Sequence, residues 1–135
     1  MIWEAKSIGA SAILLIVSIL DDVQLKEYLN LAHELGLSAI VETHDAEEIK
    51  SAVDAGAQII GVNNRNLAYF TVDIDNSINL RSLVSDDITF ISESGIKTKE
   101  DVTRLKENNV DAVLIGETLM KSDDKKAMIF QLKNG

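Results

Sequence analysis

Six polar side chains that could do chemistry stand at the ends of apolar runs in the middle of the sequence. They are Glu42, Asn63, Asn64, Arg65, Glu93 and Ser94. Carboxylates held close together have pKa values that are pushed apart, so that one can act as an acid and another as a base. A nearby guanidinium could keep a carboxylate ionised or bind a substrate carboxylate through two hydrogen bonds. The set therefore predicts an acid–base site, and the alternative is an ion-pair network that only joins the strand ends.

Two glycines, Gly95 and Gly116, follow the last two apolar runs. A glycine at a strand end allows backbone N–H groups to approach a ligand closely. In a (β/α)₈ barrel, the loops after the final two strands form the usual phosphate site together with a helix N-terminus. Each glycine alone could be a simple turn residue, but the pair favours a phosphate-binding site.

The elements that must position these groups follow a repeating strand–helix pattern. The predicted strands are residues 12–17, 38–43, 58–63, 88–94 and 112–117. They are near-continuous apolar runs, which is typical of strands buried on both faces of a parallel sheet. Amphipathic stretches between and after them are the predicted helices, at residues 23–36, 45–56, 99–109 and 123–134. Asp45 and Thr98 are predicted N-caps, and Gly36 and Gly56 are predicted helix ends.

Alternating strands and helices predict one α/β domain over residues 1–135, with a parallel sheet and right-handed crossovers. Two architectures fit, a doubly wound open sheet and a (β/α)₈ barrel. Neither of the glycine-rich nucleotide-binding motifs follows a strand, which disfavours nucleotide binding.

Composition disfavours several other classes. The net charge of −9 disfavours a nucleic-acid partner. The absence of cysteine excludes a thiolate metal site and suits the cytoplasm. The longest apolar run, residues 12–17, is too short to span a membrane, and the first ten residues do not resemble a signal peptide.

His44 has no second histidine at metal-ligand spacing, and residues 73–77 lack the rest of a calcium loop, so no metal is expected. Residues 73–77 are predicted to be a solvated loop and a helix start.

Five segments, in their order and spacing, carry a resemblance to a known family. They are ILLIV, ETHD, IIGVNNRNL, SESGI and LIGETLM. The chain resembles the C-terminal part of indole-3-glycerol phosphate synthase over essentially its whole length. The resemblance implies strands four to eight of a (β/α)₈ barrel and a carboxy-lyase of tryptophan biosynthesis that uses no cofactor. That reaction closes the indole ring of 1-(2-carboxyphenylamino)-1-deoxyribulose 5-phosphate with loss of carbon dioxide and water. The segment GVNNRNL disfavours phosphoribosylanthranilate isomerase, a related barrel.

The resemblance implies four catalytic residues. Glu42 would transfer a proton in the dehydration step, and Asn63 would hold the substrate near the reacting carbonyl and hydroxyl groups. Glu93 and Ser94 would line the site from the strand that follows. Carboxylates can also stabilise a cationic intermediate before carbon dioxide leaves.

The resemblance also implies five substrate-binding residues. Arg65 would orient the carboxylates of the site. Gly95, Gly116 and the amide of Glu117 would bind the phosphate. Leu14 would form an apolar wall against the aromatic ring of the substrate.

The family's catalytic lysine lies on a barrel strand upstream of residues 12–17 and has no counterpart in these 135 residues. We therefore expect the chain alone to turn over substrate very poorly. Five strands cannot close an eight-stranded barrel, so the first and last would have unpaired edges. Self-association, or association with a separate N-terminal segment, is the expected consequence. The alternative function is a non-catalytic half-barrel that binds phosphate.

Overall fold

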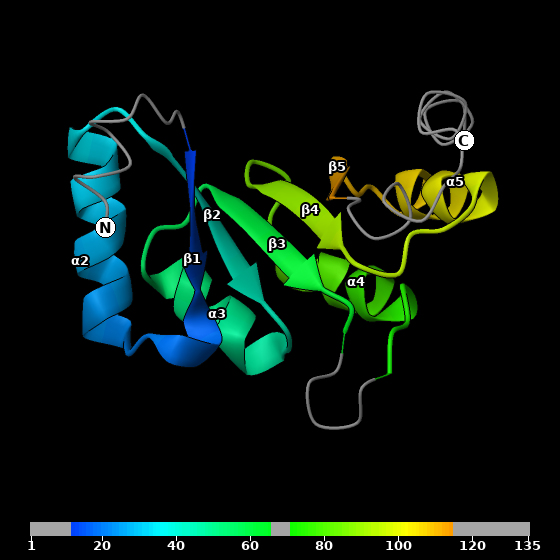
Figure 1. Cartoon of the computed structure of the whole chain (residues 1–135), viewed down its shortest axis with the longest axis horizontal. Helices are drawn as coiled ribbons and strands as arrows, with labels where there is room; N and C mark the ends of the chain where they lie inside the picture. Colours follow the sequence, from blue (N-terminus) through cyan, green and yellow to red (C-terminus); the bar gives the residue numbers. More distant parts are fainter. Residues whose placement is uncertain (1–11, 66–70, 115–135) are drawn as a thin grey trace, which may run out of the picture.

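The computed structural model describes residues 12–65 and 71–114. Its centre is a five-stranded parallel sheet in which each strand pairs with the next one along the chain, in the order β1-β2-β3-β4-β5 (Figure 1). The strands are β1 (Ala12–Ile16), β2 (Ser38–Thr43), β3 (Ile59–Asn63), β4 (Thr89–Glu93) and β5 (Ala112–Leu114). This sequential order matches a (β/α) barrel, because a doubly wound sheet reverses its strand order at a switch point. The five predicted strands and the partial-barrel prediction are confirmed over the described residues, and residues 115–117 of the last predicted strand lie outside them.

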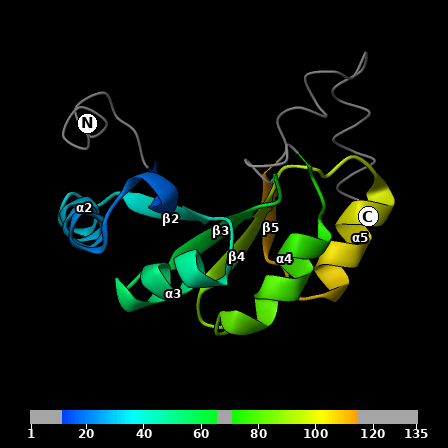
Figure 2. The same cartoon turned by 90° about the horizontal axis from the view of Figure 1, so that it is seen from below.

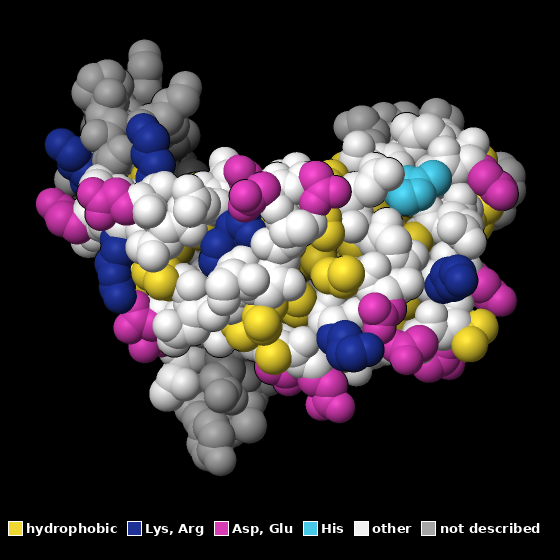
Figure 3. Space-filling view, turned by 180° about the vertical axis from the view of Figure 1, so that it is seen from behind, with side chains coloured by type: hydrophobic (Ala, Val, Ile, Leu, Met, Phe, Trp, Pro, Cys, Tyr) yellow, Lys and Arg dark blue, Asp and Glu magenta, His cyan; other side chains and the backbone are white. Residues whose placement is uncertain are grey.

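The helices follow the strands and lie along one side of the curved sheet (Figure 2). They are η1 (Val17–Ile19), α2 (Asp22–Glu34), α3 (Ala46–Asp54), α4 (Asp75–Leu80), η2 (Arg81–Leu83) and α5 (Lys99–Glu107). No helix within residues 12–65 and 71–114 lies on the other side of the sheet. Acidic and basic side chains are interspersed over the helix-bearing side (Figure 3). No helix in the described ranges is long and apolar enough to cross a membrane.

Local capping explains where the helices begin and end. Asp45 accepts a hydrogen bond from the backbone of Glu48 at 2.8 Å, and Thr98 forms a reciprocal capping box at the start of α5. Gly36 and Gly56 follow α2 and α3 with φ angles of 73° and 91°, which is the left-handed conformation that ends helices. These four predictions are confirmed. The predicted helix at residues 123–134 lies outside the described residues.

Successive residues of each strand face opposite sides of the sheet, and the two sides differ sharply. On the helix-covered face, the side chains of Leu15, Val41, Ile60, Val62 and Phe90 are at most 1% exposed. On the other face, which we call the open face, Leu14 is 45% exposed and Leu114 is 55% exposed. The prediction of strands buried on both faces is therefore wrong for the outer strands β1 and β5, because the helices cover one face only. On the central strands, Gly61 and Glu93 are buried although they lie on the open face.

The sheet does not close into a barrel within the described residues. β1 pairs only with β2, and β5 pairs only with β4. The predicted unpaired edges are thus present on both outer strands. In a closed barrel, the open face would be the interior wall, filled by side chains from the opposite strands.

Candidate active site

The open face carries its polar groups at the carboxyl ends of three neighbouring strands. Glu42 lies on β2 in register with Gly61 of β3, and Asn63 of β3 lies in register with Glu93 of β4. Paired residues of parallel strands point to the same face, so Glu42, Asn63 and Glu93 converge. The structure therefore brings together three of the four predicted catalytic residues.

Glu93 has the most unusual environment of the described side chains. It is only 2% exposed, and neither carboxyl oxygen has a hydrogen bond of normal geometry among the described residues. Burial, followed by the negative charge of Glu42, raises the pKa of Glu93 to about 8. The Glu93 carboxyl therefore holds a proton at neutral pH, when an exposed glutamate would have lost its own.

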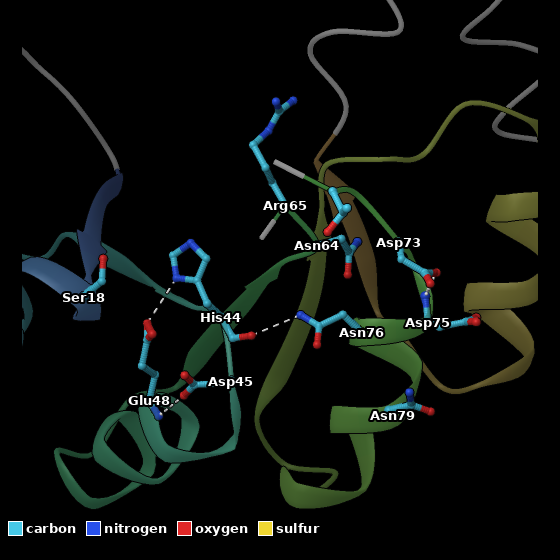
Figure 4. Close-up of a pocket in the computed structure, with 11 residues that line it drawn as sticks. Ser18, His44, Asp45, Glu48, Asn64, Arg65, Asp73, Asp75, Asn76 and Asn79 are labelled. Carbon is cyan, nitrogen blue, oxygen red and sulfur yellow. Dashed lines mark hydrogen bonds and ion pairs between the residues drawn. The ribbon is translucent and has the colours of Figure 1, made fainter. Parts of the chain in front are cut away.

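His44 connects Glu42 to the first turn of α3. Its Nδ1 lies 3.1 Å from Glu48 Oε1, and its Nε2 lies 3.9 Å from Glu42 Oε2. Figure 4 shows the ring turned toward Glu48. Because a carboxylate only accepts hydrogen bonds, this contact places a hydrogen on Nδ1. The sequence singled out His44 without giving it a role, and the structure places it beside a predicted catalytic residue.

The two asparagines that end β3 have opposite environments. Asn63 lies on the open face, and its Oδ1 accepts a hydrogen bond from the backbone N–H of Arg65 at 3.0 Å. Asn64 is buried, and its Nδ2 donates to Ser92 Oγ and to the carbonyl of Ser94, both at 2.9 Å. Asn64 therefore supports the strand ends and is not exposed toward a substrate.

Ser77 completes the buried network around Asn64. Its hydroxyl donates to Asn64 Oδ1 at 2.6 Å and lies 2.7 Å from Ser92 Oγ. Its side chain is fully buried, so the prediction of a solvated loop at residues 73–77 is wrong at this position. The helix start predicted there is confirmed, because α4 begins at Asp75. Ser77 was missed because an isolated serine in a polar segment gives no signal of burial.

Ser94 and Gly95 turn the chain sharply after β4, with φ angles of 70° and 78°. The Ser94 carbonyl is fixed by Asn64. A Cβ on Gly95 would lie 2.5 Å from Cγ1 of Val72, so this position requires glycine both for its φ angle and for space. These structural reasons are sufficient for Gly95, and its role in phosphate binding stays a prediction. Gly116 and Glu117 lie outside the described residues.

A cavity of about 530 Å³ opens beside the site, between the loops that follow β2 and β3 (Figure 4). Arg65 and His44 line it, and Asn76 on α4 donates a hydrogen bond to the backbone carbonyl of His44 at 3.1 Å. In Figure 4 the Arg65 side chain extends away from Asn76 and Asn79.

Leu14 lies on the open face of β1, in register with Ile40. It is thus on the same face as Glu42 but on the outermost strand.

The fold and the site define a class: an open part of a (β/α) barrel, with ionisable groups at the carboxyl ends of its strands. The family model described as indole-3-glycerol phosphate synthase matches residues 1–132. The chain is 62% identical over 133 residues to the indole-3-glycerol phosphate synthase of Leuconostoc mesenteroides, covering 98% of this chain and 51% of that protein. The corresponding protein of Ruminiclostridium cellulolyticum is 55% identical, with 98% and 51% covered. This chain belongs to the indole-3-glycerol phosphate synthase family, and it spans about half the length of these curated relatives.

Solved structures with low sequence identity support the same fold. The 3-hexulose-6-phosphate synthase of Salmonella typhimurium matches with a TM-score of 0.80 at 16% identity, covering 96% of this chain and 64% of that chain. The thiamine phosphate pyrophosphorylase of Pyrococcus furiosus matches with a TM-score of 0.77 at 16% identity, with 98% and 62% covered. At this identity the likeness concerns the fold alone.

Proposed function

We propose that this chain provides the second half of an indole-3-glycerol phosphate synthase active site. The reaction would be ring closure of 1-(2-carboxyphenylamino)-1-deoxyribulose 5-phosphate, with loss of carbon dioxide and water. The observation that carries the proposal is the pair of Glu42 and Glu93 on the open face. Burial and the Glu42 charge raise the pKa of Glu93 to about 8, so one carboxyl of the pair can hold a proton at neutral pH.

The two carboxyls would take different parts in the reaction. Glu93 would donate or hold a proton within the site, because its protonated form is favoured by burial. Glu42 would accept the proton lost during dehydration, with His44 fixed behind it by Glu48. The negative charge that the pair retains would stabilise the cationic intermediate before carbon dioxide leaves.

The remaining predicted residues would bind the substrate. Asn63 and Ser94 would contact it beside the carboxyl pair, and Arg65 would bind its carboxylate. Leu14 would support the aromatic ring. Gly95, with Gly116 and Glu117 from outside the described residues, would bind the phosphate through backbone N–H groups.

We also propose that a complementary polypeptide covers the open face and pairs with β1 and β5. Three features support this: half of the relatives' length is matched, two strand edges are unpaired, and apolar side chains are exposed on the open face. The complementary polypeptide would carry cationic groups, because the two carboxyls lie close together and the oxygens of buried Glu93 have no hydrogen-bond partner among the described residues. Self-association would cover the same apolar surface without adding such a group from another sequence. The cytoplasmic location suggested by the cysteine-free sequence stays a prediction.

Mixing tests the proposal directly. The 135-residue chain is combined with a polypeptide corresponding to the part of the Leuconostoc mesenteroides relative that this chain does not match, and formation of indole-3-glycerol phosphate is followed. We expect very low turnover from either part alone and at least a hundredfold more from the mixture, roughly the scale of effect that positioned acid–base groups provide. The mixture made with the Glu93→Gln chain is the matched control and should stay near the level of the separate parts. Equal turnover by the wild-type and Glu93→Gln mixtures would refute the role of the pair.

The half-length match also leaves room for a second function, a non-catalytic half-barrel that binds phosphate esters. Calorimetry with a phosphate monoester distinguishes the two. Binding by the chain alone, together with no gain in turnover on mixing, would favour this second function.

A further inference from the structure

Gly61 lies on β3 between the two strands that carry the paired carboxyls. It is in register with Glu42 on β2 and with Ile91 on β4. Ile91 is two residues before Glu93, so the two side chains lie on the same face of the sheet. The Glu93 side chain leans back over Gly61, so that a Cβ built there would be 3.0 Å from both Cδ and Oε2 of Glu93. Real Cβ atoms seldom approach other heavy atoms this closely, so the Glu93 carboxyl occupies the space that a side chain at position 61 would need.

The backbone gives no reason for a glycine at this position. Gly61 lies inside a strand, where glycine weakens the element because it has no side chain to pack and loses much conformational freedom. Its φ angle is not in the left-handed range that Gly36, Gly56 and Gly95 adopt. A glycine that is unfavourable for the strand and unnecessary for the backbone is explained by the carboxyl that lies on it.

We propose that Gly61 is a positioning residue whose missing side chain lets the Glu93 carboxyl lie across β3 toward Glu42. The backbone cannot easily move instead, because Thr43 donates a hydrogen bond to the Gly61 carbonyl at 2.9 Å within the core. An added methyl group would therefore displace the flexible end of Glu93 and leave the strand in place. The catalytic value of this arrangement rests on the proposed function, whereas the placement of Glu93 does not.

The displacement has a measurable electrostatic consequence. The charged group that acts on Glu93 from the neighbouring strands is Glu42, and His44 lies behind Glu42 at 3.9 Å. Moving Glu93 away from the sheet exposes its carboxyl to water and increases its distance from Glu42. Both changes favour the ionised form, so the pKa of Glu93 falls.

Carboxyl-carbon NMR titration of the full 135-residue chain tests this placement. The wild-type Glu93 resonance should titrate near pH 8, and in Gly61→Ala the midpoint should be lower than in wild type. Ala112→Val, which enlarges a side chain on the same face of edge strand β5, is the control and should leave the midpoint unchanged. Glu42→Gln removes the charge without occupying space and should also lower the midpoint.

The outcomes separate the inference from the proposed function. An unchanged midpoint in Gly61→Ala, beside a lowered one in Glu42→Gln, would overturn the role of Gly61 and leave the carboxyl pair intact. A wild-type midpoint near 4.5 would overturn both the pair and the inference. A lowered midpoint in Gly61→Ala supports the inference even if the mixing experiment shows no turnover.

Thermal melting provides a second test that does not depend on NMR. Gly61→Ala should lower the melting temperature of the wild-type chain, because the methyl group meets Glu93. In a Glu93→Ala background the same substitution should raise the melting temperature, because alanine suits a strand better than glycine. A loss of the same size in both backgrounds would show that the methyl group meets something other than Glu93.

Discussion

The two faces of the sheet share the same five strands but use their residues for different purposes. Phe90 and Ile91 are neighbours in β4, yet Phe90 is completely buried under the helices and Ile91 lies on the partly exposed open face. The covered face therefore provides the hydrophobic stabilisation of the described fold. The open face contributes less to stability and carries the ionisable groups.

Polar groups make the contrast sharper. On the helix side, Asn64, Ser77 and Ser92 are buried but hydrogen-bonded to one another. On the open face, Glu93 is equally buried, but its carboxyl has no hydrogen bond of normal geometry among the described residues. A buried group without such compensation is costly in a structural role, and perturbed groups of this kind concentrate at functional sites.

The largest expected effect comes from comparing the neighbours Phe90 and Ile91 by substitution. Phe90→Ala should lower the free energy of unfolding by about 3–5 kcal/mol, because it leaves a cavity in the core and removes the ring over which the Arg81 guanidinium lies at 5.2 Å. Ile91→Ala is the matched variant and should cost less than about 2 kcal/mol, since its side chain is already partly hydrated. Urea unfolding measures both. Equal losses would show that the open face is covered in solution.

The next comparison concerns the adjacent asparagines at the end of β3. Asn64→Ala should destabilise the chain by about 2–3 kcal/mol, because it leaves the buried hydroxyls of Ser77 and Ser92 and the Ser94 carbonyl with fewer partners. Asn63→Ala should cost less than about 1 kcal/mol, since it removes only a hydrogen bond to the Arg65 backbone. Urea unfolding of both variants checks this. A larger loss of unfolding free energy for Asn63→Ala than for Asn64→Ala would show that Asn63, and not Asn64, supports the strand ends.

Glu93 makes the stability of the chain depend on pH in an unusual direction. Its pKa is about 8 in the folded chain and near 4.5 when exposed, so the folded state binds the proton more tightly between these values. Its stabilising contribution is complete below about pH 4.5 and is lost as the pH rises through 8. Glu93→Gln should therefore abolish this dependence. It should make the chain more stable than wild type above about pH 8, by about 2 kcal/mol after allowance for solvent screening.

Melting curves of wild type and Glu93→Gln between about pH 5 and about pH 8.5 measure that difference. Glu48→Gln is a useful control, because Glu48 lies beyond His44 and outside the carboxyl pair. If Glu93→Gln and wild type lose stability in parallel over this range, Glu93 is not the titrating group.

The strands that position the site could be predicted from local sequence. Which of the polar side chains at their ends are buried in the structure, and which lie on the open face, could not. The β-rich runs ended at Glu42, Asn63 and Glu93, and the strands end within one residue of the predicted positions wherever the chain is described. The asparagine pair was ambiguous, because Asn64 has left the strand and no longer follows its alternation.

The contact between Glu93 and Gly61 was also beyond sequence reasoning. It depends on the direction in which a flexible side chain leans across a neighbouring strand, and the local sequence does not determine that direction. The burial of Ser77 likewise depends on where α4 packs in the fold. The sequence of residues 73–77 does not indicate that position.

The smallest expected effect, at Leu14, shows most directly whether the open face is covered. In the chain alone, Leu14→Ala should change the free energy of unfolding by less than about 1 kcal/mol, because Leu14 is 45% exposed on an edge strand. Leu15→Ala, one position along, is the matched control and should cost about 2–4 kcal/mol, since Leu15 is buried under the helices. If a second copy or a complementary polypeptide packs on the open face, the loss at Leu14 should rise toward that at Leu15 and should depend on protein concentration. A small loss at Leu14 that stays constant at every concentration, with and without the complementary polypeptide, would show that the open face remains exposed.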